Sequence, residues 1–93
     1  MLVGVCRIEL FVPDSSSLKS KRFVLNSIKK RIRNKFNVSV SEIGNNDKWQ
    51  RITLGISTIS NERRFIDMTM SEILKVIDDD VRMEIVNHSV EVY

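Results

Sequence analysis

Five polar side chains between residues 22 and 33 have the types and spacing needed to contact a row of phosphates. They are Arg22, Asn26, Lys29, Lys30 and Arg33. Their steps of four, three, one and three residues place them in a line on an α-helix, beside its apolar stripe. Because a helix rises about 1.5 Å per residue, this line covers about 16 Å, enough for two or three successive phosphates. The pattern predicts contacts with a nucleic-acid backbone.

Charge is segregated along the chain, and the basic line lies in its basic part. Residues 18–51 hold ten of the fifteen Lys and Arg residues and two acids, so this segment carries +8 while the whole chain carries +3. Lys19 and Lys21 precede the line, and no acid stands among residues 19–35. A solvated helix face, the alternative, would commonly alternate Glu and Lys at four-residue spacing. The missing acids favour an external polyanion such as RNA or DNA.

The run from Lys48 to Arg51 is a second candidate contact. The indole of Trp49, the only tryptophan, offers a flat face for a base, while Arg51 can hold a phosphate or a partner carboxylate. The alternative, which the sequence favours, is that Trp49 packs at the edge of the core or in a subunit interface. With Trp49 set aside as a stacking or interface residue, the candidate nucleic-acid contacts are Lys19, Lys21, Arg22, Lys29, Lys30, Arg33, Lys48 and Arg51.

Four serines near the expected start of the first helix combine hydroxyls with neighbouring cations. Ser15, Ser16, Ser17 and Ser20 stand beside Lys19, Lys21 and Arg22. A helix start can hold a phosphate, but this segment lacks the glycines of a nucleotide-binding loop. Capping of the helix by the serine hydroxyls is therefore the favoured interpretation, and a phosphate site is the alternative.

The remaining reactive residue types predict no catalytic or metal site. His88 is the only histidine and has no nucleophile motif near it, so a polar strand residue is expected. The consecutive carboxylates Asp78 to Asp80 lack the alternating spacing of a calcium loop, which favours a solvated acidic turn. The single Cys6 is expected to be a buried small hydrophobe. No cofactor is expected.

Six elements are needed to position these residues. Hydrophobic periodicity predicts strands over residues 2–12, 37–43, 49–60 and 82–93 and helices over residues 18–35 and 62–77. Side-chain caps are expected before both helices, from the hydroxyls of Ser15 to Ser17 for the first and from Ser60 and Asn61 for the second. Ile59 falls out of phase with Ile52, which predicts a bulge near Thr58.

This order predicts an α+β, ferredoxin-like fold. Two strand-helix-strand units with right-handed crossovers give a βαββαβ chain, a four-stranded antiparallel sheet and two helices on one face. The opposite face must then meet water or a partner. Its expected residues are Arg7, Glu9, Ser39, Ser41, Arg51, Thr53 and Ser57.

Length and composition indicate one domain over residues 1–93. Its apolar fraction of 42% and charged fraction of 29% are those of an ordinary soluble protein. The N-terminal run is interrupted by Arg7 and Glu9 and has no basic leader, so it predicts neither a secretory signal nor a membrane span. A cytoplasmic location without membrane contact is expected.

Several segments of the chain together resemble the YlxP-like family of small bacterial proteins, a domain of unknown function. They are Leu18-Lys19-Ser20-Lys21-Arg22, Lys35-Phe36-Asn37-Val38-Ser39-Val40 with Glu42, Asp47 with Trp49-Gln50-Arg51, and Leu54-Gly55 with Ser60-Asn61. Ser41 stands where the family more often has alanine. The resemblance spans essentially the whole chain and implies a ferredoxin-like fold. It also implies an accessory role near translation and ribosome maturation, without an established activity.

Three functional hypotheses follow from these patterns. The first is a non-enzymatic accessory protein that binds structured, ribosomal RNA or the ribosome through its first helix and the Lys48 to Arg51 run. The alternative is a homodimeric interaction module that uses the open sheet face or an edge strand, with Trp49 in the interface. An enzyme acting on a small phosphorylated compound at the serine-rich helix start is the third, and no general acid or base is placed there.

Overall fold

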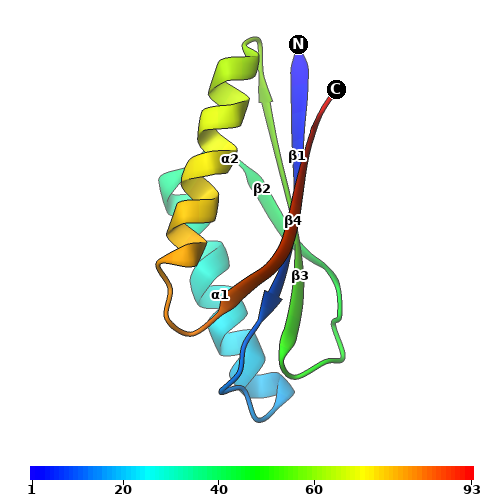
Figure 1. Ribbon diagram of the computed structural model, residues 1–93, viewed down its shortest axis with the longest axis vertical. Coiled ribbons are helices and arrows are strands. Elements are labelled where there is room, and N and C mark those ends of the chain that lie inside the picture. The colour runs from blue at the N-terminus through cyan, green and yellow to red at the C-terminus, as the bar shows by residue number, and fades with distance from the viewer.

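The computed structural model describes residues 1–93, and the six elements occur in the predicted order (Figure 1). They are β1 (Leu2–Phe11), α1 (Leu18–Lys35), β2 (Ser39–Gly44), β3 (Arg51–Ser60), α2 (Arg63–Asp78) and β4 (Glu84–Val92). The bounds of α1 agree with the expected helix, and the other bounds differ by one or two residues. Neither helix is long and apolar enough to cross a membrane.

The four strands form one antiparallel sheet in the order β2-β3-β1-β4. Both helices cover the same face of this sheet, and the other face is open (Figure 1). The predicted ferredoxin-like arrangement is therefore confirmed. The two chain ends lie together at one end of the molecule, where the backbone amides and carbonyls of Val3 and Tyr93 exchange hydrogen bonds of 2.9 and 2.8 Å.

Apolar side chains at every second position of the central strands β1 and β3 form the core on the helix side of the sheet. Cys6, Ile8 and Leu10 of β1 are fully buried, and their partners in β3 are Ile56, Leu54 and Ile52. Leu25, Ile28 and Ile32 of α1 and Ile66, Met70 and Ile73 of α2 close this core from the helix side. Cys6 is buried as expected, and burial raises the pKa of its thiol to about 11. Gly4 is required here, because a Cβ at that position would collide with Ile66.

The predicted bulge near Thr58 is wrong. The register of β1 with β3 continues without a break from Phe11 and Arg51 to Leu2 and Ser60. Ile59 is out of phase because it lies on the open face, where its side chain is 65% exposed. The irregularities occur in the two edge strands instead, where Ile43 in β2 and Val86 in β4 are extra residues.

The caps of the two helices differ. Ser17 caps α1, since its Oγ accepts a hydrogen bond of 3.0 Å from the Ser20 amide. α2 begins after Glu62, which makes no side-chain cap. The predicted cap of α2 by Ser60 and Asn61 is wrong, because the N-cap residue is Glu62; the Ser60 Oγ accepts a 3.1 Å bond from the Glu62 amide, which lies outside the helix.

Candidate nucleic-acid interface

The distribution of ion pairs separates two groups of cations. Seven of the fifteen Lys and Arg side chains pair with a carboxylate: Arg7, Lys21, Arg31, Arg63, Arg64, Lys75 and Arg82. The other eight have no such partner and all lie between residues 19 and 51: Lys19, Arg22, Lys29, Lys30, Arg33, Lys35, Lys48 and Arg51. Positive charge that the protein does not neutralise itself is thus confined to α1 and the entry to β3.

Five of these cations follow one side of α1, and we call Lys19, Arg22, Lys29, Lys30 and Arg33 the α1 basic stripe. Lys29 is half-buried and the other four are exposed. Arg33 shows which way the stripe faces, because its Nη2 donates a 2.8 Å bond to the carbonyl of Val40 in the edge strand β2. The helical spacing places the stripe beside the core stripe, on the side of α1 toward β2.

Lys21, predicted as a nucleic-acid contact, lies inside the protein. Its side chain is 1% exposed, and its ammonium lies 3.0 Å from the Glu42 carboxylate. The same nitrogen donates to the carbonyls of Asn45, Asn46 and Arg51 at 2.8, 3.3 and 3.3 Å. It cannot reach an external phosphate in this conformation. The missed signal was its spacing, since Lys21 precedes Leu25 by four residues and therefore belongs to the core stripe.

Lys21 holds the loop between β2 and β3 against the first turns of α1. Asn45 begins this loop with φ of 60°, a left-handed conformation that Asn tolerates better than most residues. Its Nδ2 donates a 2.9 Å bond to the Oγ1 of Thr53, whose side chain is 1% exposed although it belongs to the open face. The loop is thus fastened from both sides of the sheet, and Lys48 to Gln50 project from a fixed base.

The β2–β3 loop and the β1–α1 turn meet at the end of the molecule opposite the chain ends (Figure 1). Two bonds of 2.8 Å join them, from Gln50 Nε2 to the Pro13 carbonyl and from the Val12 amide to the Gln50 carbonyl. Between them lies an open hollow of about 710 Å³, which we call the Trp49 hollow. It is lined by Phe11, Pro13, Asp14, Ser15, Ser16, Lys48, Trp49, Gln50 and Arg51.

Trp49 is not a core residue. Its side chain is 56% exposed and forms part of the wall of the Trp49 hollow, so packing at the edge of the core is wrong, while the alternative of a subunit interface stays a prediction. The guanidinium carbon of Arg51 lies 5.6 Å from the centre of the Phe11 ring. Phe11 was not among the residues expected on the open face, although its odd position on β1 is that of this face.

The four serines at the start of α1, Ser15, Ser16, Ser17 and Ser20, hydrogen-bond to one another's hydroxyl and backbone groups. The Ser20 hydroxyl oxygen accepts bonds from the amides of Ser16 and Ser17 at 3.1 and 3.2 Å. Ser15 Oγ donates to the Ser17 carbonyl at 3.2 Å. These contacts confirm the capping interpretation and occupy several of the amides and hydroxyls that a phosphate would need.

The acidic turn differs from the expectation at one of its three residues. Asp78 and Asp79 are exposed, but Asp80 is buried and accepts bonds of 2.9 and 2.7 Å from Arg82 Nε and Nη2. Arg31 of α1 lies 3.4 Å from the same carboxylate. The hydrogen bonds from Arg82 hold the pKa of Asp80 below its ordinary value. Asp80 therefore joins the α2–β4 turn to α1 instead of facing solvent.

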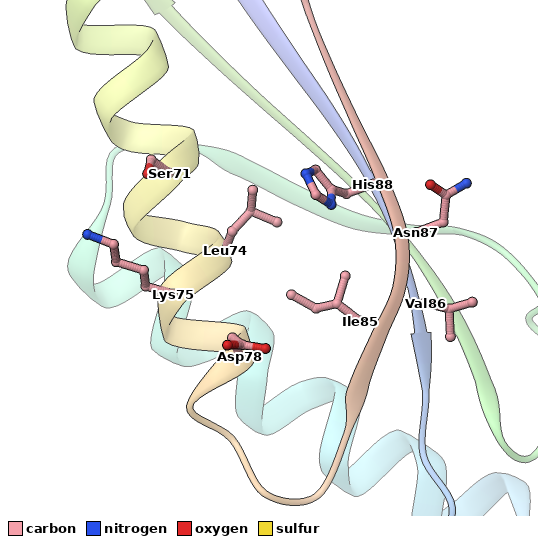
Figure 2. A pocket seen from close by; sticks show the side chains of 8 residues that line it. All are labelled: Ser71, Leu74, Lys75, Asp78, Ile85, Val86, Asn87 and His88. Atoms are coloured by element: carbon pink, nitrogen blue, oxygen red, sulfur yellow. The ribbon is translucent and has the colours of Figure 1, made fainter.

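A second hollow, of about 600 Å³, lies between α2 and the edge strand β4 (Figure 2). Figure 2 shows His88 and Ile85 on the side of β4 toward α2, whereas Val86 and Asn87 point away from that helix. Ser71, Asp78 and His88 are all exposed, and no hydrogen bond or ion pair joins them. These polar groups therefore act as separate solvent-facing side chains.

Solved structures similar to this chain share its fold. A de novo designed protein with a ferredoxin fold, studied by solution NMR, matches 100% of this chain and 84% of its own with a TM-score of 0.59 and 10% identity. A dimeric ferredoxin-like protein from an uncultured marine organism matches 100% of this chain and 96% of its own with a TM-score of 0.56 and 6% identity. At these identities the likeness shows the fold alone.

Sequence comparison shows the family. The uncharacterized protein YlxP of Bacillus subtilis (strain 168) is 41% identical over 83 residues, which cover 89% of this chain and 90% of that protein. The family model described as "Protein of unknown function (DUF503)" matches residues 3–90. With that match across nearly the whole chain, and with a YlxP relative and the ferredoxin-like fold expected from the sequence, this protein belongs to the DUF503 family.

Proposed function

We propose that this protein is a non-enzymatic accessory factor that binds structured RNA, such as ribosomal RNA, through its phosphates. The contacts are the α1 basic stripe together with Lys48 and Arg51. The observation that carries the proposal is the placement of all eight unpaired cations between residues 19 and 51. Without Lys21 seven of the predicted contacts remain, and Lys21 holds the loop of Lys48 against α1.

Physical chemistry favours a polyanion over a solvated face at this surface. Cations in line on one helix repel one another, and α1 has no acid in its first turn or elsewhere along its length to offset this. A nucleic acid supplies a matching row of phosphates, and its binding releases condensed counterions. The acids gather in residues 52–93, whose formal charge is −4. That half repels RNA and leaves the α1 side to approach it.

The test uses two triple variants of equal charge. In the first, Arg22, Lys29 and Lys30 of the stripe are changed to Glu; in the second, the exposed Arg63, Arg64 and Lys75 are changed to Glu. Each variant takes the formal charge of the chain from +3 to −3, because each of the three reversals removes one positive and adds one negative charge. Binding to ribosomal subunits and to a generic RNA duplex is measured across a salt series, with thermal unfolding in parallel.

The stripe variant is expected to lose most RNA affinity, and its slope of log K against log salt should fall by about 2 to 3. The second variant should keep a slope close to that of the unchanged protein. Equal losses in both variants would mean that net charge alone attracts RNA, and full binding by a folded stripe variant would exclude the stripe.

The second candidate function is a homodimeric interaction module built on the open sheet face. The observation that favours it is a group of exposed apolar side chains on that face, Val5, Ile43 and Ile59, at 38%, 55% and 65% exposure. The marine neighbour of the same fold is described as dimeric. Arg7 and Glu9 form an ion pair of 3.3 Å on the central strand, so the face presents both signs of charge to a second copy.

A further inference from the structure

We propose that the Trp49 hollow binds one unstacked nucleotide of the RNA, with the base on the Trp49 indole and its phosphate between Lys48 and Arg51. This inference rests on the proposed function and adds a preference for single-stranded or bulged RNA. The α1 basic stripe alone would read only a backbone.

The indole is presented to solvent from a fixed base. A tryptophan that is 56% exposed is unusual, because this side chain is highly buried on average. The neighbouring Gln50 is tied to the β1–α1 turn by its side chain and by its carbonyl, each through a 2.8 Å bond. Lys21 holds the other end of the loop through the carbonyls of Asn45 and Asn46. The wall that carries the indole is therefore formed before any ligand arrives.

The charges in the lining indicate which side chains would hold the phosphate. Lys48 and Arg51 line the hollow and have no carboxylate partner, and the Arg51 guanidinium is held over the Phe11 ring. The one acidic side chain in the lining, Asp14, repels a phosphate and can accept bonds from base amino groups. Within the lining, Lys48 and Arg51 are the groups that would hold the phosphate, and the Trp49 indole is the group on which the base would stack.

Size and position also suit a nucleotide. The open volume of about 710 Å³ lies within the usual range of small-molecule sites, which is about 300 to 1,000 Å³. Ser15 and Ser16 of its wall stand just before Ser17, the N-cap of α1, so the hollow lies at the end of α1 where Lys19 begins the basic stripe. A strand whose phosphates follow the stripe can therefore place one nucleotide in the hollow.

The single tryptophan gives a direct readout. Fluorescence of the full-length protein, excited at about 295 nm, is followed on titration with a hexamer of riboadenylate; the exposed indole should be quenched by stacking. The same length of abasic ribose-phosphate chain and inorganic phosphate serve as probes without a base. Neither should quench the indole, and equal quenching by either probe would make the hollow an anion site and overturn the proposal.

A second measurement uses labelled RNA and two variants. Trp49→Ala is expected to weaken binding of the labelled hexamer by about 5- to 150-fold while leaving a blunt RNA duplex unaffected. Tyr93→Ala removes an aromatic side chain of 70% exposure at the opposite end of the molecule and should change neither affinity. Thermal unfolding of both variants verifies that they are folded.

The results for the stripe variant and for Trp49→Ala distinguish failure of the nucleotide site from failure of the proposed function. If the stripe variant loses RNA while Trp49→Ala binds the hexamer and the duplex as before, the hollow takes no nucleotide but the α1 surface still binds RNA. If Trp49→Ala lowers the mass in solution from that of a dimer to that of a monomer without changing RNA affinity, Trp49 is a protein-interface residue and the inference is overturned. If the hexamer quenches Trp49 but the stripe variant keeps full affinity for the duplex, the proposed function fails and the hollow stands as a nucleotide site.

Discussion

Lys21 shows how one residue can join two parts of a site without contacting a ligand. Its ammonium has the Glu42 carboxylate and three backbone carbonyls as partners, all within 3.3 Å. A buried cation is tolerated only when it is paired and hydrogen-bonded in this way. Lys21 thus holds the loop that carries Lys48 and Trp49, and its effect on binding is indirect.

Changing Lys21 to Met should destabilise the protein by about 3 to 5 kcal/mol, because Glu42 then keeps a half-buried charge without its partner. The double variant Lys21→Met, Glu42→Leu should recover much of this loss, since an apolar pair leaves no uncompensated charge. Urea unfolding followed by circular dichroism measures both. A stability equal to the unchanged protein in the single variant would show that this ion pair does not hold the loop.

At the scale of the elements, the α2–β4 turn is joined to α1 by a charged cluster. Arg82 donates to Asp80 and, through Nη2, to Ser27 Oγ of α1 at 3.0 Å. Arg31 approaches Asp80 from the same helix. The cluster keeps the acidic turn away from the α1 basic stripe, because it fixes this turn to the side of α1 that the stripe does not use.

Replacing Asp80 by Asn should lower the free energy of unfolding at neutral pH by about 1.5 to 3 kcal/mol, the range for hydrogen bonds to charged groups. The folded-state pKa of Asp80 is lowered from 3.8, so its contribution is fully present above that value and disappears as pH falls through the folded pKa. The difference in stability between the two proteins should therefore shrink in acid below about pH 4. A difference in unfolding free energy that stays constant from pH 7 to pH 2 would contradict a stabilising role for the Asp80 carboxylate.

At the scale of the whole molecule, the two faces have different partners in the two candidate functions. Six of the eight unpaired cations lie on α1, while the open sheet face carries exposed apolar side chains around the Arg7–Glu9 pair and, at one end, Arg51 over the Phe11 ring. A dimer through Val5, Ile43 and Ile59 does not use the α1 basic stripe, so the two functions can operate together there; Arg51, on the open face, is the contact that both would share. A dimer that buries the open faces would leave both α1 stripes exposed.

If the open face pairs two copies, light scattering should give twice the 10.8 kDa mass of one chain at high protein concentration. Changing Ile43 and Ile59 to Glu should then return the mass to that of a monomer, because like charges would meet across the interface. Val81→Glu is the matched control, since Val81 is 97% exposed in the α2–β4 turn. A monomeric mass for the unchanged protein at every concentration would remove the dimer as a candidate.

The sequence by itself determined the order of the elements, the fold and the segregation of charge. Alternation in β1 and β3 and the helical spacing of α1 depend on local periods of two and 3.6 residues, which the chain displays directly. The exposed basic side of α1 also follows from spacing alone. These features are local, so one segment suffices to predict each of them.

Only the tertiary structure decided the fates of Lys21, Asp80, Trp49 and Ile59. Each depends on groups distant in the chain: Glu42 and the β2–β3 loop for Lys21, Arg31 for Asp80, the β1–α1 turn for Trp49 and the partner strand for Ile59. A charged side chain is buried when folding brings it enough donors or acceptors, and an aromatic one stays exposed when no element covers it. Residue type alone does not show whether a charge finds partners or whether an aromatic ring is covered, because both depend on the assembled fold.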